Sequence, residues 1–259
     1  MALSYGNQSI GRGKVYVANF KTGTHTPESW RYLGESPSFS INIQSDKLEL
    51  FSSDSGVRVK MKSVTLQTNR TGSLVLNDIN NENLALFFFG SQTTLAQTSA
   101  TAQTETFTAV KKGYYYQIGI TSGNPTGVRS VSNVVVTVSS VAKTLGTDYT
   151  VDATRGTIYI PDTSTIADAS TMVVTYDRAA VSRKQVISGT TEVEGALRYV
   201  ADNPEGEDND FYMPYVKVSA NGDFNLKGDD WLQLPLNVEI LEDTAYSKAA
   251  IYIDGQPSA

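Results

Sequence analysis

A strict alternation of apolar and polar residues near the C-terminus constrains the fold more than any other feature of the sequence. A period of two places the apolar members on one face of a β-strand, where they can pack against a core. Pro235 lies on the other face and cannot donate a hydrogen bond to a neighbouring strand, so its amide side is expected at a sheet edge or a bulge. The apolar positions of this series are Leu232, Leu234, Leu236, Val238 and Ile240.

The same period recurs through most of the chain, which predicts a mainly β protein with a sandwich or barrel-like core. One segment departs from it. Asn80 to Asn83 offers an N-cap and an early acid, the next six residues are apolar, and Gly90 supplies a stop signal. These start and stop signals predict one short helix that plugs the core.

Two changes of phase interrupt the alternation between residues 39 and 66. In the first half, apolar residues occupy odd positions from 39 to 43 and then even positions at Leu48 and Leu50. In the second half, they occupy odd positions as far as Met61 and even positions from Val64 onward. The residues Ser53-Asp54-Ser55-Gly56 between them form a turn signal. A slip of one residue exchanges the two faces of a strand, and a bulge or bend is the usual cause.

We interpret residues 39–66 as a long hairpin whose outer half, residues 48–61, leaves the core sheet; this outer half is called the arm. An isolated two-stranded ribbon is marginally stable in water, so the arm needs a neighbour to cover its apolar side chains. Oligomerisation would supply one. The alternative is a local irregularity in an ordinary sandwich. The apolar side chains expected at a contact between copies are Leu48, Leu50, Phe51, Val57, Val59 and Met61.

The chain divides into three segments. Residues 1–104 and 183–259 are expected to form one core, and residues 105–182 a small inserted β-module with its own core. The Thr-, Ser-, Ala- and Gln-rich stretch 91–106 is interpreted as a linker. Val216 to Ala220, the strand after Gly228 and the pair Ile251 and Ile253 supply the strands of the C-terminal segment.

The residue types that most catalytic sites need are scarce in this chain, which argues against catalysis. The chain has no cysteine and a single histidine, His25, in a turn-rich loop where it is expected to be solvated. Thiolate, zinc and Ser-His-Asp chemistry therefore lack their usual residues, and no catalytic, metal or cofactor site is predicted. Glu192 and Glu194 would share one face of a strand, which is the only feature that favours a hydrolase.

No apolar run approaches the roughly 20 residues of a membrane-spanning helix. The segment Met1 to Ile10 has neither a basic start nor an apolar stretch. The sequence therefore predicts no signal peptide and folding in a cytoplasm.

Negative charge is concentrated near the C-terminus. Residues 201–259 carry twelve acids and three lysines, a net charge of −9 in a chain whose total is −6. The remainder lacks the dense basic surface of a duplex-binding protein. The spacing of the five acids in residues 202–210 does not match the helix-loop-helix calcium template, so a solvated or lumen-facing loop is favoured over a calcium site.

The order of these features resembles the major tail tube protein family of long-tailed bacteriophages. The resemblance covers most of residues 1–100 and 183–259, and each matching piece is short. The matching pieces are Gly13-Lys14-Val15-Tyr16-Val17-Ala18, Tyr32-Leu33-Gly34-Glu35, the long hairpin, Asn83-Leu84-Ala85-Leu86-Phe87 to Gly90, Asn203-Pro204-Glu205-Gly206, Val216-Lys217-Val218, Leu226-Lys227-Gly228-Asp229-Asp230-Trp231 and Leu236-Asn237-Val238-Glu239-Ile240-Leu241-Glu242-Asp243.

The resemblance implies a structural protein of the virion tail, assembled in the bacterial host cytoplasm. Six copies would join sheets edge to edge into a ring, rings would stack into a tube, and the hairpin would bridge successive rings. DNA would run through the lumen without specific binding, and an acidic wall would repel it. Implied partners are other copies of the chain and the tape-measure, baseplate or tail-tip and tail-terminator proteins, with no membrane. The candidate lumen acids are Asp202, Glu205, Glu207, Asp208, Asp210, Asp223, Asp229 and Asp230.

A second class of function stays open. In it the module 105–182 recognises a surface, as an adhesion module of a virion or cell-surface assembly, and the remainder is scaffold. Rings or tubes of the purified chain would support the first class, and persistent monomers the second.

Overall fold

The computed structural model of the chain describes residues 8–54 and 56–255 and is mainly β, as the alternation predicts. Within that part it holds several antiparallel sheets and one α-helix, α1 (Asn81–Phe87), with a short 3-10 turn, η1 (Thr244–Tyr246). The strands are β1 (Gly13–Asn19), β2 (Arg31–Tyr32), β3 (Ser38–Phe51), β4 (Lys60–Leu76), β5 (Ser91–Gln97), β6 (Ala100–Val110), β7 (Tyr115–Gln117), β8 (Val131–Val138), β9 (Val141–Ala142), β10 (Thr150–Asp152), β11 (Thr157–Tyr159), β12 (Ser170–Arg178), β13 (Val181–Ile187), β14 (Val193–Ala201), β15 (Asn209–Ala220), β16 (Leu234–Ile240) and β17 (Tyr252–Gly255).

The chain forms two compact units, each with its own core. Unit 1 comprises Met1–Thr93 and Val186–Ala259, and unit 2 comprises Thr94–Gln185. The chain first passes from unit 1 to unit 2 between residues 93 and 94, earlier than the expected boundary between residues 104 and 105. Most of residues 91–110 belong to the strands β5 and β6. The interpretation of residues 91–106 as a linker is therefore wrong.

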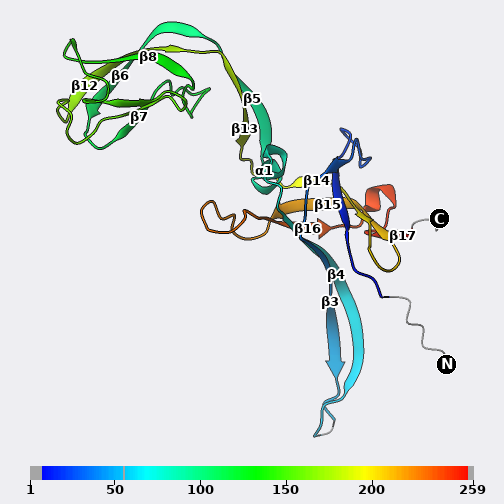
Figure 1. Cartoon of the computed structure of the whole chain (residues 1–259). Coiled ribbons are helices and arrows are strands. Elements are labelled where there is room, and N and C mark those ends of the chain that lie inside the picture. Colours follow the sequence, from blue (N-terminus) through cyan, green and yellow to red (C-terminus); the bar gives the residue numbers. More distant parts are fainter. Residues whose placement is uncertain (1–7, 55, 256–259) are drawn as a thin grey trace. The chain divides into compact units, whose positions relative to one another are not determined.

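Unit 1 is built on a sheet in the order β2-β1-β14-β15-β16-β4-β3, with β17 added to β15 (Figure 1). β16 lies inside this sheet, between β15 and β4, and not at its edge. Pro235 is tolerated because it is the second residue of β16, one position before the first pair between β16 and β15, Leu236 with Ala220. Leu74 to Leu76 form the end of β4.

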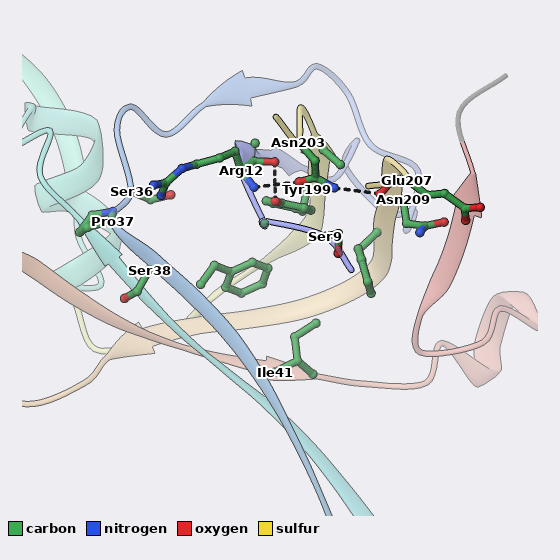
Figure 2. A pocket seen from close by; sticks show the side chains of 15 residues that line it. Ser9, Arg12, Ser36, Pro37, Ser38, Ile41, Tyr199, Asn203, Glu207 and Asn209 are labelled. Atoms are coloured by element: carbon green, nitrogen blue, oxygen red, sulfur yellow. Dashed lines mark hydrogen bonds between the residues drawn. The ribbon is translucent and has the colours of Figure 1, made fainter. Parts of the chain in front are cut away.

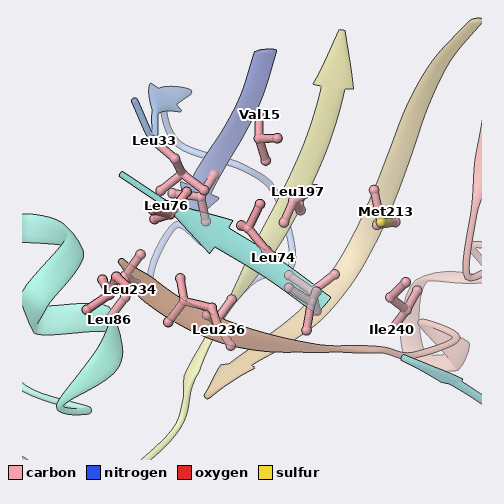
Figure 3. Packing of buried hydrophobic residues seen from close by; sticks show 14 of the residues in the cluster. Val15, Leu33, Leu74, Leu76, Leu86, Leu197, Met213, Leu234, Leu236 and Ile240 are labelled. Atoms are coloured by element: carbon pink, nitrogen blue, oxygen red, sulfur yellow. The ribbon is translucent and has the colours of Figure 1, made fainter. Parts of the chain in front are cut away.

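The core of unit 1 is the apolar face that the alternation predicts (Figure 3). Leu234, Leu236, Val238 and Ile240 of β16 are all buried, and they pack with residues of β1, β4, β14 and β15. Leu232 lies before the strand and remains exposed. One face of the sheet thus supplies most of the hydrophobic stabilisation of this unit.

Helix α1 closes one side of that core. Its N-cap Asn80 accepts a hydrogen bond from the Asn83 backbone amide at 2.8 Å, as the sequence predicts. The Asn83 side chain is buried and donates to the Leu33 and Asp78 carbonyls. Leu86 and Phe87 face the core. The cap and the buried amide therefore fix a helix of only two turns.

Unit 2 contains the sheets β6-β12-β8-β9 and β10-β11-β7 around a second core, which includes Val110, Ile158, Met172 and Val174. Asp148 joins two loop segments by hydrogen bonds at one edge of this core. Its carboxylate accepts hydrogen bonds from the Thr144 amide at 2.8 Å and from the Thr165 amide and hydroxyl at 3.0 and 2.7 Å. These donors, with the Thr144 amide contributing most, lower the pKa of Asp148 to about 2.

We expect unit 2 to lose stability as the pH falls from about 4 toward 2. The pKa of Asp148 is lower in the folded state than its ordinary value of 3.8. Its contribution is therefore complete above about pH 4 and is lost as the carboxylate protonates below it. Asp148→Asn should lower the melting temperature of unit 2 at pH 7, and the difference from wild type should shrink at pH 2.5.

Far-UV circular dichroism measures this melting. Both tryptophans of the chain, Trp30 and Trp231, belong to unit 1. Tryptophan fluorescence should therefore report an unchanged unit 1 in the same variant. If the variant and wild type differed in melting temperature by the same amount at pH 7 and at pH 2.5, this would contradict the role given to the Asp148 carboxylate.

Candidate functional site: the arm, two acidic loops and a groove

The hairpin of β3 and β4 continues past the rest of the sheet as a two-stranded ribbon (Figure 1). β16 pairs with β4 only from Thr71 to Leu76, and β3 pairs with β4 as far as Phe51 and Lys60. The ribbon therefore begins near Ile43 and Arg70, further in than the predicted arm. The arm is its outer end, as predicted, except that Ser55 of the expected turn lies outside the described residues.

Two register shifts in the ribbon each leave an extra residue on β4. One lies between the pairs Asp46 with Gln67 and Lys47 with Thr65, and leaves Leu66 as an extra residue on β4. The second lies between Leu50 and Phe51. Leu48 faces Val64 across the ribbon, on the face opposite to that of the core-facing Phe39. β3 has no extra residue, so its apolar side chains pass to the other face with the change of parity in the sequence, and the extra residue Leu66 on β4 puts Val64 on that same face.

The arm exposes its apolar side chains. Each of the six predicted contact residues is between 38% and 75% exposed. Burying a Leu or Met side chain fully is worth roughly 1.5–3 kcal/mol, so the uncovered arm forgoes a substantial stabilisation. The six are Leu48, Leu50, Phe51, Val57, Val59 and Met61.

The end of the arm is held together by local polar contacts. The Ser52 amide donates to the Val59 carbonyl at 2.8 Å, and Lys60 pairs with Glu49. The Arg58 guanidinium lies 5.7 Å from the centre of the Phe51 ring. The arm, residues 48–61, carries two cations and two acids, so its net charge is zero.

The candidate lumen acids fall on two loops. The first acidic loop, residues 202–208, joins β14 to β15. Asp208 accepts from the Asn203 amide at 2.7 Å, and Asp210, at the start of β15, accepts from the Ala201 amide at 2.9 Å. Asp202, Glu205 and Glu207 are exposed, and none of the ion pairs found among residues 8–54 and 56–255 includes them.

The second acidic loop, residues 221–233, joins β15 to β16. Asp223, Asp229 and Asp230 line a hollow of about 270 Å³ there. Trp231 beside them is 88% exposed. Phe224 anchors the loop, with its ring 5.8 Å from that of Phe87 on α1.

The structure does not bring the eight acids together. The two acidic loops lie at opposite ends of β15, a strand of 12 residues. At about 3.3 Å per residue the loops are separated by roughly 36 Å if the strand is fully extended. The acids therefore form two separate groups, which can be changed independently.

A groove near the first acidic loop was not predicted (Figure 2). A hollow of about 500 Å³ lies between the starts of β1, β3 and β15 and the end of β14, and a second of about 440 Å³ adjoins it. The two share Ile41 and Phe211, so we describe them together as the groove. Its apolar floor consists of Phe39, Ile41, Ile43, Phe211, Ile251 and Ile253.

Polar residues border the groove. Tyr199 donates its hydroxyl to the Arg12 carbonyl at 2.7 Å, and burial, with Asp208 and Asp210 nearby, raises the pKa of Tyr199. Glu207 lines the groove where it meets the first acidic loop, and Arg12 and Arg70 lie at its two ends. No sequence pattern could reveal the groove, because its walls come from strands far apart in the chain.

His25 is half-buried and contacts a buried carboxylate, whereas the sequence predicted a solvated side chain. Its Nδ1 lies 2.9 Å from Oδ1 of Asp243, whose side chain is 1% exposed. Its ring packs on Phe20 and on Tyr215, with centres 4.9 and 4.7 Å away. Lys248 lies 3.7 Å from the other Asp243 oxygen and donates to the His25 carbonyl. This cluster ties the loop after β1 to the turn before β17.

Of the two carboxylates in the hydrolase alternative, Glu194 lies on β14 and Glu192 directly precedes that strand. Glu194 on β14 lies opposite Lys217 on β15, and their charged groups are 3.1 Å apart. This contact raises the pKa of Lys217. Glu194 is thus bound to a cation on the neighbouring strand.

Within residues 8–54 and 56–255, no group of three or more His, Asp or Glu side chains is placed to hold a metal ion. No helix in the same part of the chain has the length and apolar character to span a bilayer.

Comparison with known proteins places the chain in a family. A search of curated proteins finds no match. Residues 8–251 match the family model described as "Protein of unknown function UCP028589". Because this match covers far more than half of the 259 residues, the chain belongs to that family.

Proposed function

We propose that the chain is a structural, non-enzymatic subunit of a bacteriophage tail tube, in which stacked rings surround a lumen that conducts DNA. The observation that carries the proposal is the arm, the outer end of a two-stranded ribbon with the loop that joins its strands, and its six exposed apolar side chains. Natural proteins avoid such ribbons unless a partner covers them, because they template aggregation. A ring or tube of identical copies would supply that cover.

The free edge of β3 also supports self-assembly. Among residues 8–54 and 56–255, β3 is the last strand in the order of the unit 1 sheet and pairs on one side only, with β4. Its 14 residues leave a long row of backbone groups without a neighbouring strand. Edge-to-edge pairing between copies, six to a ring, would complete the sheet. The tape-measure, baseplate or tail-tip and tail-terminator proteins are the proposed further partners in the virion.

Negative-stain microscopy of the purified chain over a range of concentrations tests the proposal. We expect rings or tubes of uniform diameter with a central lumen. Molecules that stay monomeric at high concentration would contradict it.

We also expect the second acidic loop to affect DNA passage. An acidic wall repels phosphates, whereas a cationic wall would hold them through counterion release. Tubes with Asp223, Asp229 and Asp230 all changed to Lys should therefore eject DNA several-fold more slowly than wild type, and more so at low salt. If the assembled variant ejected DNA at the wild-type rate, this would show that the second acidic loop does not line the lumen.

A second candidate, surface recognition by unit 2, is favoured by one observation. Tyr115 and Tyr159 lie opposite each other on β7 and β11, with ring centres 4.6 Å apart, and Tyr115 is 72% exposed. Paired exposed aromatic rings are common in binding surfaces. Under this candidate the purified chain stays monomeric and binds cell surfaces, and Tyr115→Ala weakens the binding.

A further inference from the structure

A row of aromatic side chains with one arginine crosses the face of the unit 1 sheet that lies opposite its core. Tyr16 on β1 lies opposite both Tyr32 on β2 and Arg198 on β14. Tyr212 on β15 lies opposite both Arg198 and Tyr252 on β17. A residue next to each of them in sequence packs in the core, and side chains alternate between the two faces of a strand. The aromatic row is defined as Trp30, Tyr32, Tyr16, Arg198, Tyr212 and Tyr252.

Contacts between the rings and the guanidinium hold the aromatic row together. Trp30, Tyr32 and Tyr252 are 37%, 44% and 44% exposed. The Arg198 guanidinium lies over the rings of Trp30 and Tyr212, 5.7 and 6.0 Å from their centres. These two rings meet edge to face, with their centres 6.0 Å apart. Two cation–π contacts therefore hold the guanidinium in place on an accessible surface.

Arg198 is exposed and has no acidic partner. Within residues 8–54 and 56–255, none of the ion pairs found includes it. Two other cations of the same sheet each have a glutamate, because Arg31 lies 3.3 Å from Glu82 and Lys217 lies 3.1 Å from Glu194. A guanidinium presents a rigid, planar fork of donors that matches a carboxylate. The cation of the aromatic row is thus fixed in place, with its donors available to a carboxylate of another molecule.

Charge and ring arrangement favour a carboxylate on a protein segment over a nucleic acid or a sugar. Asp210 and Asp254 lie opposite each other on the same face, two residues from the aromatic row on their strands. They would repel a chain of phosphates more strongly than a single carboxylate. A stacked base or sugar ring needs an open aromatic face, whereas the Trp30 ring already lies under the guanidinium. Trp, Tyr and Arg are the residue types that contribute most to binding between proteins.

We propose that the aromatic row is the docking surface for a segment of a different protein, which presents one Asp or Glu side chain between apolar residues and places that carboxylate on Arg198. The row crosses five neighbouring strands. At about 4.8 Å between strands it is roughly 19 Å long, which is the length of an extended segment of about six residues. The inference goes beyond the proposed function, because the row contains no residue of the arm and its occupant is not another copy of the chain.

A fluorescence titration tests this contact, with Trp30 of the aromatic row as the reporter. Trp231→Phe leaves Trp30 as the only tryptophan of the full chain, and Trp231 is 88% exposed, so its replacement should not disturb the fold. The probe is the capped peptide acetyl-Ala-Leu-Phe-Glu-Leu-Ala-amide, and the matched peptide carries Gln in place of Glu. We expect a saturable change with the Glu peptide and about tenfold weaker binding of the Gln peptide, because hydrogen bonds to a charged group are the stronger ones.

Arg198→Gln, made in the same Trp231→Phe chain, should remove the preference, so that both peptides bind equally weakly. The matched control is Arg58→Gln, because the Arg58 guanidinium also lies over an aromatic ring, that of Phe51 on the arm. This control should bind both peptides as the parent chain does. Arg58 and Arg198 are both exposed, so neither change should unfold unit 1, and thermal melting followed by circular dichroism checks this.

Three results would overturn the inference. The first is no saturation by the Glu peptide up to about 5 mM, and the second is equal affinity of the two peptides for the chain that retains Arg198. The third is loss of rings and tubes in Arg198→Gln with unchanged melting, which would make another copy of the chain the occupant of the aromatic row. Wild-type chain that forms neither rings nor tubes would contradict the proposed function alone, because peptide binding is measured independently of assembly.

Discussion

Replacing Leu50 and Met61 with Asp abolishes assembly while the monomer stays folded: this is the largest effect that we expect from any change to the chain. The two side chains are 57% and 66% exposed in the monomer. Exposed substitutions usually change the free energy of unfolding by less than about 0.5 kcal/mol. In an interface the same carboxylates would be desolvated without partners, which is strongly unfavourable.

Sedimentation velocity and negative-stain microscopy measure the loss of assembly, and tryptophan fluorescence measures the stability of unit 1. The matched control is Val141→Asp with Leu145→Asp in unit 2, where both side chains are 60% exposed. The control removes as much exposed apolar surface, yet it should assemble as wild type does. Tubes formed by the Leu50 and Met61 variant at the wild-type concentration would exclude the arm from the contact between copies.

Local sequence patterns predicted the parts of the fold that depend on local physics. β16 follows from strict alternation, and α1 follows from the cap at Asn80 and the stop at Gly90. The change of phase on the returning strand coincides with the bulge at Met61, whereas the change on β3 occurs along a strand that has no extra residue.

Patterns failed where long-range pairing decides the structure. Residues 91–106 read as a linker because Thr, Ser, Ala and Gln give no apolar period. They form strands because β13 and β12 pair with them, and threonine suits a pleated, half-exposed surface. The strand β6 thus owes its conformation to a partner about 70 residues further along the chain.

In the candidate site, too, the parts that depend on local sequence were predictable and those that depend on long-range contacts were not. The arm was predictable, since it is a single hairpin whose side chains have no core to face. The groove was not, because β1, β3, β14, β15 and the segment before β17 each contribute one or a few residues. His25 and Asp243 lie 218 residues apart, so a loop histidine gave no sign of its buried partner.

Removing the carboxylate of Asp243 should destabilise unit 1 by about 2–3 kcal/mol, somewhat less than the roughly 3–5 kcal/mol for breaking a fully buried ion pair. Asp243 is buried and contacts both His25 and Lys248. Asp243→Ala leaves both without their carboxylate partner and opens a small cavity. The His25 and Lys248 side chains are 27% and 29% exposed, so water can solvate them in part and the loss stays below that of a fully buried pair.

Urea unfolding followed by tryptophan fluorescence isolates unit 1, since both tryptophans belong to it. Asp243→Asn is the matched control, because it retains the volume and an acceptor for His25 but removes the charge. We expect the Asn variant to lose roughly half as much stability as the Ala variant, since a hydrogen bond of about 1 kcal/mol is kept. Equal midpoints for wild type and the Ala variant would show that the cluster of His25, Asp243 and Lys248 does not hold the loop after β1 against the turn before β17.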